Sequence, residues 1–190
     1  MDKNGAMPAV LAGHSLGEWS ALVCAGAVKF EDAVGIVRSR GALMQDAVPV
    51  GIGAMAAIIG LDDESICQSC ADARGDEVVD AVNFNAPGQV VIAGSADAVG
   101  RAIELCKAAG AKRALPLPVS APFHTSLMAP AAEGLTEQVR SVMFSTPEIP
   151  VIHNVRGQSE SDPAVIKQLM LEQIYSPVRW VDCVLELRRR

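Results

Sequence analysis

The stretch that decides the fold is GHSLG at residues 13–17, a Gly-x-Ser-x-Gly pentapeptide near the start of this 190-residue sequence. It follows the apolar run VLA at residues 10–12 and precedes a segment with the composition of a helix. A strand, this turn and a helix are typical of a nucleophile elbow, in which flanking glycines let the backbone pass without a Cβ clash. The context predicts that Ser15 is a nucleophile. The alternative is a tight strand-to-helix connection that serves only packing.

Composition and charge narrow the class of protein. Half of the residues are hydrophobic and 20% are charged, which is enough to bury a sizeable core. The net charge of −6 argues against nucleic acid as the main partner. The sequence has neither an apolar run of membrane-spanning length nor a secretory signal. We therefore expect a cytoplasmic protein without a nucleic-acid or membrane partner.

The cysteines do not predict a metal site. Cys67 and Cys70 form a lone C-x-x-C inside a predicted helix. A zinc site would need a second ligand pair at similar spacing, and the sequence has none. We predict reduced thiols, with no bound metal and no cofactor.

The middle of the sequence predicts a separate unit. The expected strands are 53–60, 78–84, 89–93 and 112–117, and the expected helices are 62–73 and 95–109, with Asp62 and Ser95 as N-caps. The order β-α-β-β-α-β is that of a ferredoxin-like unit. We predict an inserted ferredoxin-like subdomain over residues 53–120.

The flanking segments, residues 1–52 and 121–190, are predicted to form one core around the elbow. The expected elements are helices at 16–25, 31–47, 125–143, 163–173 and from Pro177 onward, with a strand at 151–155. Because this elbow sits at the top of an α/β-hydrolase sheet, the predicted fold class is α/β. It combines an α/β-hydrolase-like core, with a parallel sheet, and the inserted subdomain.

Arg40 lies on the apolar face of the predicted helix 31–47, whereas Arg38 does not. A guanidinium directed inward is costly unless an anion meets it. Arg40 is therefore either part of an anion-binding site, or a side chain that reaches the rim or forms a structural ion pair. The helical pattern leaves these alternatives open.

A serine nucleophile needs a base, and the sequence contains three histidines. His14 is adjacent to Ser15 and is expected to support the elbow or form a pocket wall, while His153 lies in a predicted strand and reads as structural. His124 lies in a proline-containing loop, SAPFH at residues 120–124, and is predicted to take the Ser15 proton. No acid between serine and histidine stands out, so a backbone carbonyl could orient the imidazole.

Five ordered segments carry a resemblance to a known family. They are GHSLGEWSALVCAGAV, the arginine in RSRG, VNFNAPGQVVIAG, AGAKRALPLPVSAPFH and QIYSPVRW. Together they resemble the malonyl-CoA:acyl carrier protein transacylases, which load malonyl units for bacterial fatty acid synthesis. Relatives of that family are the acyltransferase domains of polyketide synthases. The resemblance covers essentially the whole sequence.

The resemblance implies a role for each residue of the predicted centre. Ser15 would become malonylated and His124 would be its base, oriented by the backbone carbonyl of Gln173. Arg40 would hold the malonyl carboxylate with its bidentate fork. The amide of Leu16 would donate to the oxyanion.

The resemblance also implies residues that border the acyl pocket. His14, Asn83, Asn85 and Phe123 match its lining, although turn-capping is an equally good interpretation of the two asparagines. Phe123 resembles the form of this loop associated with malonyl rather than branched extender units.

A basic spot is implied at Lys112 and Arg113, which match a surface suited to acidic acyl carrier protein. The alternative is a solvated strand end. The partners implied are thus malonyl-CoA and phosphopantetheinylated acyl carrier protein, in a ping-pong transfer.

Two other functions stay open from the sequence. The same elbow could serve a serine thioesterase or esterase. Members of the resembled family are also longer at both ends, and an upstream G-Q-G-S-Q loop supplies their second oxyanion donor. The core would then be incomplete, and the chain could be a catalytically impaired fragment that binds acyl carrier protein.

Overall fold

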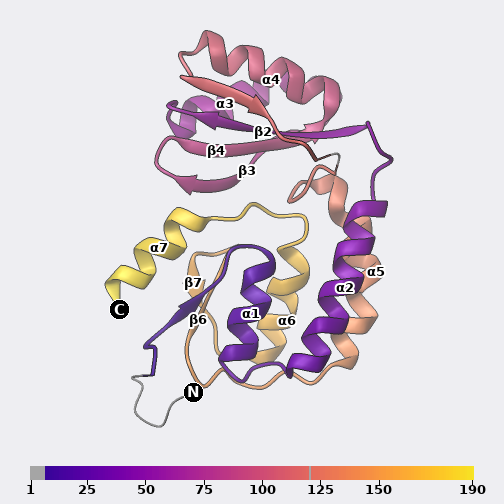
Figure 1. Cartoon of the computed structure of the whole chain (residues 1–190), viewed down its shortest axis with the longest axis vertical. Helices are drawn as coiled ribbons and strands as arrows, with labels where there is room; N and C mark the ends of the chain where they lie inside the picture. The colour runs from indigo at the N-terminus through magenta and orange to yellow at the C-terminus, as the bar shows by residue number, and fades with distance from the viewer. Residues whose placement is uncertain (1–6, 120) are drawn as a thin grey trace.

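The structure is a computed structural model that describes residues 7–119 and 121–190. It contains two sheets, each with its own helices (Figure 1). Residues 1–6, in the predicted core, and Ser120, at the predicted subdomain boundary, lie outside the described residues. In the described part of the chain, no helix is both long and apolar enough to cross a membrane.

The elbow belongs to the half of the molecule that contains the smaller sheet. Its elements are β1 (Leu11–Ala12), α1 (Leu16–Cys24), α2 (Phe30–Asp46), a 3₁₀ turn (Ser126–Met128), α5 (Ala129–Ser141), β6 (Val151–His153), β7 (Gln158–Ser159), α6 (Pro163–Glu172) and α7 (Trp180–Arg189). Apolar side chains of α1, α2, α5 and α6 form its core. The helices bury these faces against one another, with α2 packed along α5 (Figure 1).

The predicted parallel sheet is present only as one short pair. β1 and β6 are parallel, with Leu11 opposite Val151, but β6 and β7 are antiparallel. The reason is local: a tight turn with Gly157 at φ 64° follows β6 and reverses the chain, which makes the next strand antiparallel. The described residues therefore form a mixed three-stranded sheet rather than a large parallel one.

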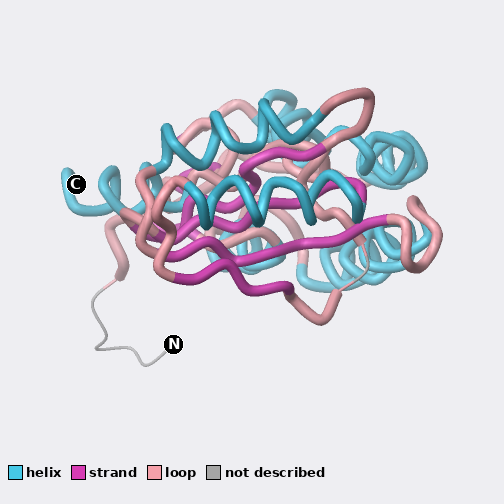
Figure 2. Tube along the Cα trace, turned by 90° about the horizontal axis from the view of Figure 1, so that it is seen from above, coloured by secondary structure: helices cyan, strands magenta, loops and turns pink. Residues whose placement is uncertain are grey.

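The larger sheet has the predicted order of elements. It contains β2 (Gly53–Ile59), α3 (Asp63–Arg74), β3 (Val79–Ala86), β4 (Gln89–Ser95), α4 (Ala96–Ala108) and β5 (Arg113–Pro116). The strands lie in the order β3-β4-β2-β5, and every neighbouring pair is antiparallel. Helices α3 and α4 lie over one face of this sheet (Figure 2), with an apolar layer between them and the strands.

The opposite face of the larger sheet meets the segments that carry the site. Met55, Val82, Val91 and Ala93 form a small buried cluster on this face, and Phe123 packs against it. The loop that contains His124 is therefore seated against the four-stranded sheet, while Ser15 comes from the other half of the molecule.

Several predicted helix ends are confirmed and others are wrong. Asp62 accepts a hydrogen bond from Ser65 N, and Asp162 accepts one from Ala164 N, so both cap their helices. Ser95 occupies the N-cap position of α4 without a side-chain cap. The last helix begins at Trp180 rather than Pro177, because the segment before it is extended and pairs with β3 through Val178.

Candidate active site

Ser15 occupies a strained corner between β1 and α1. Its φ of 52° and ψ of −109° lie in a region that L-residues rarely adopt. Gly13 makes the corner possible, since a Cβ there would lie 2.0 Å from the carbonyl oxygen of Gly17. Gly17 itself has open space around its Cβ position, so the expected clash applies to only one of the two glycines.

His124 contacts the serine hydroxyl directly. Ser15 Oγ and His124 Nε2 are 2.9 Å apart, and His124 Nδ1 is 2.8 Å from the main-chain oxygen of Gln173. Because a carbonyl oxygen only accepts, the proton resides on Nδ1 and Nε2 is left free to accept from the serine. The arrangement gives Ser15 a general base in the required tautomer.

Burial keeps the His124 imidazole neutral. Its side chain is buried, and loss of hydration lowers its pKa from 6.5 to about 4. The hydrogen bond to Gln173 raises the pKa and the Arg40 charge lowers it, but burial is the largest cause. At neutral pH the ring can therefore accept a proton.

Arg40 points at the nucleophile rather than at the rim of the protein. It is 6% exposed, and its Nη2 donates to Ser15 Oγ at 2.9 Å and to Gln173 Oε1 at 3.2 Å. Its Nε is buried without a hydrogen-bond partner among the described residues. Burial lowers the pKa of Arg40 to about 10, so the group is charged at neutral pH. This geometry favours the anion-binding alternative.

These side chains line a pocket of about 250 Å³. Its walls are His14, Ser15, Arg40, Gly41, Met44, Met55, Asn83, Phe123 and His124. Asn85 does not line it and instead pairs with His14, through a 2.9 Å contact between Oδ1 and Nε2. Asn83 Nδ2 is buried without a partner in the described chain. The pocket thus has a nucleophile, a base and a cation at one end, and an unsatisfied amide donor.

Leu16 and the basic pair lie outside this pocket. Leu16 is the first residue of α1, so its amide belongs to the helix turn whose N–H groups have no intrahelical acceptor. Its side chain is half exposed. Lys112 and Arg113 are exposed at the start of β5, where the Lys112 stem packs over Gly60.

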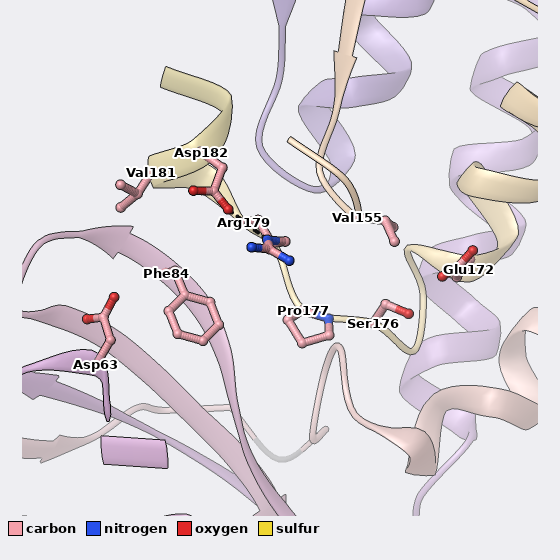
Figure 3. Close-up of a pocket in the computed structure, with 9 residues that line it drawn as sticks. All are labelled: Asp63, Phe84, Val155, Glu172, Ser176, Pro177, Arg179, Val181 and Asp182. Carbon is pink, nitrogen blue, oxygen red and sulfur yellow. Dashed lines mark hydrogen bonds and ion pairs between the residues drawn. The ribbon is translucent and has the colours of Figure 1, made fainter. Parts of the chain in front are cut away.

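A second cavity, of about 530 Å³, lies between β3 and the segment that leads into α7. Figure 3 shows Phe84 of β3 and Pro177 of that segment facing each other across it. Arg179 Nε pairs with Asp182 at its upper side. Its lining is Asp63, Phe84, Val155, Glu172, Ser176, Pro177, Arg179, Val181 and Asp182, none of which was predicted for the site.

A buried polar network below the elbow was missed by the sequence reasoning. Glu18 is fully buried and contacts His153 Nδ1 at 2.6 Å and Gln173 Nε2 at 2.6 Å. Asn154 accepts from Ser15 N at 2.7 Å and donates to Gly13 O at 2.8 Å. One signal was available: Glu18 lies four residues before the buried Leu22, so the two share a face of α1 that is directed at the core.

Known proteins are similar to this chain in sequence and in fold. A family model described as the acyl transferase domain matches residues 1–190. The malonyl CoA-acyl carrier protein transacylase of Salmonella typhimurium is 56% identical over 182 residues, which cover 96% of this chain and 59% of the relative.

Solved structures are equally similar. The crystal structure of an acyl carrier protein S-malonyltransferase from Vibrio cholerae has 60% identity and a TM-score of 0.96, covering 97% of this chain and 60% of that one. A type II PKS acyl-carrier protein in complex with its malonyl-transacylase matches with 50% identity and a TM-score of 0.96, covering 99% of this chain and 61% of that one. The chain thus spans about 59% of the length of the curated relatives that it matches, and it belongs to the acyl transferase domain family.

Proposed function

We propose that the protein transfers a malonyl group from malonyl-CoA to the phosphopantetheine thiol of acyl carrier protein, in cytoplasmic fatty acid synthesis. The intermediate is a malonyl ester of Ser15. The observation that carries the proposal is the buried Arg40 guanidinium, 2.9 Å from the same hydroxyl that contacts His124. The similarity to malonyltransferases agrees with it.

In the first half-reaction Ser15 Oγ attacks the thioester carbonyl and His124 Nε2 takes its proton. The tetrahedral intermediate carries a negative oxygen, to which the amide of Leu16 donates. The carbon–sulfur bond then breaks, and coenzyme A leaves as its thiol with the proton from His124. The product of this half is the malonyl ester of Ser15.

In the second half-reaction the phosphopantetheine thiol gives its proton to His124 and attacks the ester carbonyl. The bond to Ser15 Oγ breaks, and the hydroxyl regains the proton from the imidazole. The neutral ring of His124 in the free enzyme suits both half-reactions, because each begins when the imidazole takes a proton from the nucleophile.

Selectivity is assigned to Arg40, which would hold the malonyl carboxylate. Acetyl-CoA has no such carboxylate and would leave the buried guanidinium without an anion, at a cost of several kcal/mol. Arg40 Nε, which has no partner in the described part of the chain, is a donor that supports this role. Phe123, His14 and Asn83 would bound the acyl chain, with Asn85 holding His14.

The exposed pair Lys112 and Arg113 is proposed to contact the acidic acyl carrier protein. Arg113 is the first residue of β5 and Lys112 precedes it, at an edge of the four-stranded sheet whose other edge strand, β3, contributes Asn83 to the pocket. A carrier docked at this sheet could send its phosphopantetheine arm toward Ser15.

We also propose that residues 53–120 form a ferredoxin-like subdomain inserted into an α/β-hydrolase-like core formed by residues 1–52 and 121–190. The antiparallel order β3-β4-β2-β5 supports the subdomain, and the parallel pairing of β1 with β6 beside the elbow supports the core. In this division the pocket lies at the junction, since Met55 and Asn83 of the subdomain line it together with Ser15 and His124 of the core.

The test is covalent labelling. The protein is incubated with malonyl-CoA and its intact mass is measured, with Ser15→Ala as the control. We expect a malonyl increment on the wild type that is absent from the variant and is discharged onto holo acyl carrier protein. A wild-type protein that never gains the increment rejects the proposal. Release of malonate without any acceptor thiol would instead assign a thioesterase.

A further inference from the structure

We infer that Glu18 is a positioning residue for substrate selectivity, acting on Arg40 through the side chain of Gln173. This inference rests on the proposed malonyl transfer. Glu18 does not touch the pocket, and neither its position beside Trp19 nor the elbow motif assigns it a role in the reaction.

The hydrogen-bond directions in this chain of side chains are determined by chemistry. The Glu18 carboxylate can only accept, so Gln173 must turn its Nε2 toward it, at 2.6 Å. The same Nε2 lies 3.1 Å from the main-chain oxygen of Ser15, which is also only an acceptor. The Oε1 atom of Gln173 is thereby directed at Arg40 Nη2, 3.2 Å away. The buried carboxylate, together with the Ser15 carbonyl, thus fixes the Gln173 amide that meets the guanidinium beside the nucleophile.

This chain of hydrogen bonds from Glu18 through Gln173 to Arg40, the relay, also offsets the positive charge of Arg40 without placing a carboxylate directly on the guanidinium. The Glu18 charge acts on buried Arg40 and raises its pKa, against the larger lowering by burial. A carboxylate in direct contact would occupy the donors that a substrate carboxylate needs. Because the Gln173 amide lies between them, Glu18 stabilises the cation while Arg40 Nε keeps no partner among the described residues and can still meet a substrate carboxylate.

Gln173 is the point at which this relay joins the catalytic pair. Its main-chain oxygen holds His124 Nδ1 at 2.8 Å, and its side chain links Glu18 to Arg40. A substitution of its side chain can therefore break the link to Arg40 and keep the main-chain contact to the base. That separation makes the inference testable.

The experiment compares kcat/KM for malonyl-CoA and acetyl-CoA in three variants. Glu18→Gln keeps the shape but removes the charge, and it places an amide donor against one of the two donors that the carboxylate accepts, Gln173 Nε2 or His153 Nδ1. Gln173→Met removes the bridging atoms and keeps the main-chain carbonyl. For both we expect kcat/KM for malonyl-CoA to fall about 10- to 100-fold, with a much smaller change for acetyl-CoA. Thermal unfolding of each variant is recorded alongside.

His153→Asn is the matched control. His153 contacts the same carboxylate, at 2.6 Å, but does not lead to Arg40. We expect this variant to unfold at a lower temperature with the malonyl-to-acetyl ratio unchanged. If kcat/KM falls equally for malonyl-CoA and acetyl-CoA in Glu18→Gln and Gln173→Met, the relay is overturned. If Glu18→Gln does not fold, the result for Gln173→Met decides alone. A wild type that malonyl-CoA does not acylate would overturn the proposed function instead.

Discussion

His124 Nδ1 lies 2.8 Å from the main-chain oxygen of Gln173, where a serine hydrolase triad has a carboxylate. A carbonyl dipole orients the ring as well as a carboxylate does. It stabilises the imidazolium form less, because it carries no net charge. The base is therefore positioned firmly and yet has a low affinity for protons.

The first prediction concerns the pH dependence of Ser15 acylation. Burial lowers the pKa of His124 to about 4, so the neutral base persists well below pH 6.5. We expect kcat/KM for malonyl-CoA to stay level from neutral pH down to about pH 5 and to fall as the pH approaches 4. The measurement is the initial rate of acylation across this range, with unfolding monitored at each pH. An acidic limb centred at 6.5 or above would contradict the assignment.

The second prediction concerns Arg40. Arg40→Ala should lower kcat/KM for malonyl-CoA by roughly a thousandfold, because the substrate carboxylate loses its charged partner. Acetyl transfer should be largely spared, and Arg40→Lys should recover only part of the malonyl rate, since an ammonium lacks the planar fork. The measurement is competition between the two acyl-CoA substrates. Equal loss of both transfers would remove Arg40 from the selectivity role.

The third prediction separates the carrier surface from the active site. The double substitution Lys112→Glu and Arg113→Glu should raise KM for acyl carrier protein severalfold and leave Ser15 acylation by malonyl-CoA unchanged. Lys107→Glu is the control, since Lys107 is also exposed but lies on α4, paired with Glu104. If the rise in KM merely follows the change in net charge, which is about twice as large in the double variant as in the control, the assigned surface is wrong.

The predictable part of the site consisted of residues with a local signal. Ser15 lies in a Gly-x-Ser-x-Gly pentapeptide, Arg40 falls on the apolar face of a predicted helix, and His124 lies in a proline-containing loop. In the structure Ser15 Oγ lies within hydrogen-bond reach of both His124 Nε2 and Arg40 Nη2. The order of the strands and helices of the four-stranded sheet could also be predicted from the sequence, because turn or cap residues mark the ends of these elements.

The missed part depends on contacts between distant segments. Glu18 meets His153 and Gln173 across 135 and 155 residues, and no local pattern encodes such pairings. The start of the last helix was misplaced for a similar reason. Pro177 is a good first residue for a helix, but the backbone of Val178 pairs with β3 instead. Tertiary hydrogen bonds overrode a local preference.

The final prediction separates the two glycines of the elbow. A Cβ at Gly13 would lie 2.0 Å from Gly17 O and 2.6 Å from Glu18 N, both backbone atoms that cannot yield without moving the corner. Gly13→Ala should therefore displace Ser15 from His124 and abolish acylation, with a marked loss of stability. A Cβ at Gly17 meets nothing within 4 Å, and this glycine lies inside α1. Gly17→Ala should fold normally and, because Gly17 is the second residue of α1, gain less than the roughly 0.5–1 kcal/mol typical of a helix interior.

Chemical denaturation and malonyl labelling of the two variants make the comparison. The discriminating result is the difference between them, since both substitutions add the same methyl group two residues from Ser15. If Gly13→Ala is acylated at the wild-type rate, the close approach is not what holds the corner. If Gly17→Ala loses acylation while remaining folded, that glycine serves the substrate rather than the backbone, because, its own helix backbone and chain neighbours apart, no atom of residues 7–119 and 121–190 lies within 4 Å of the added methyl.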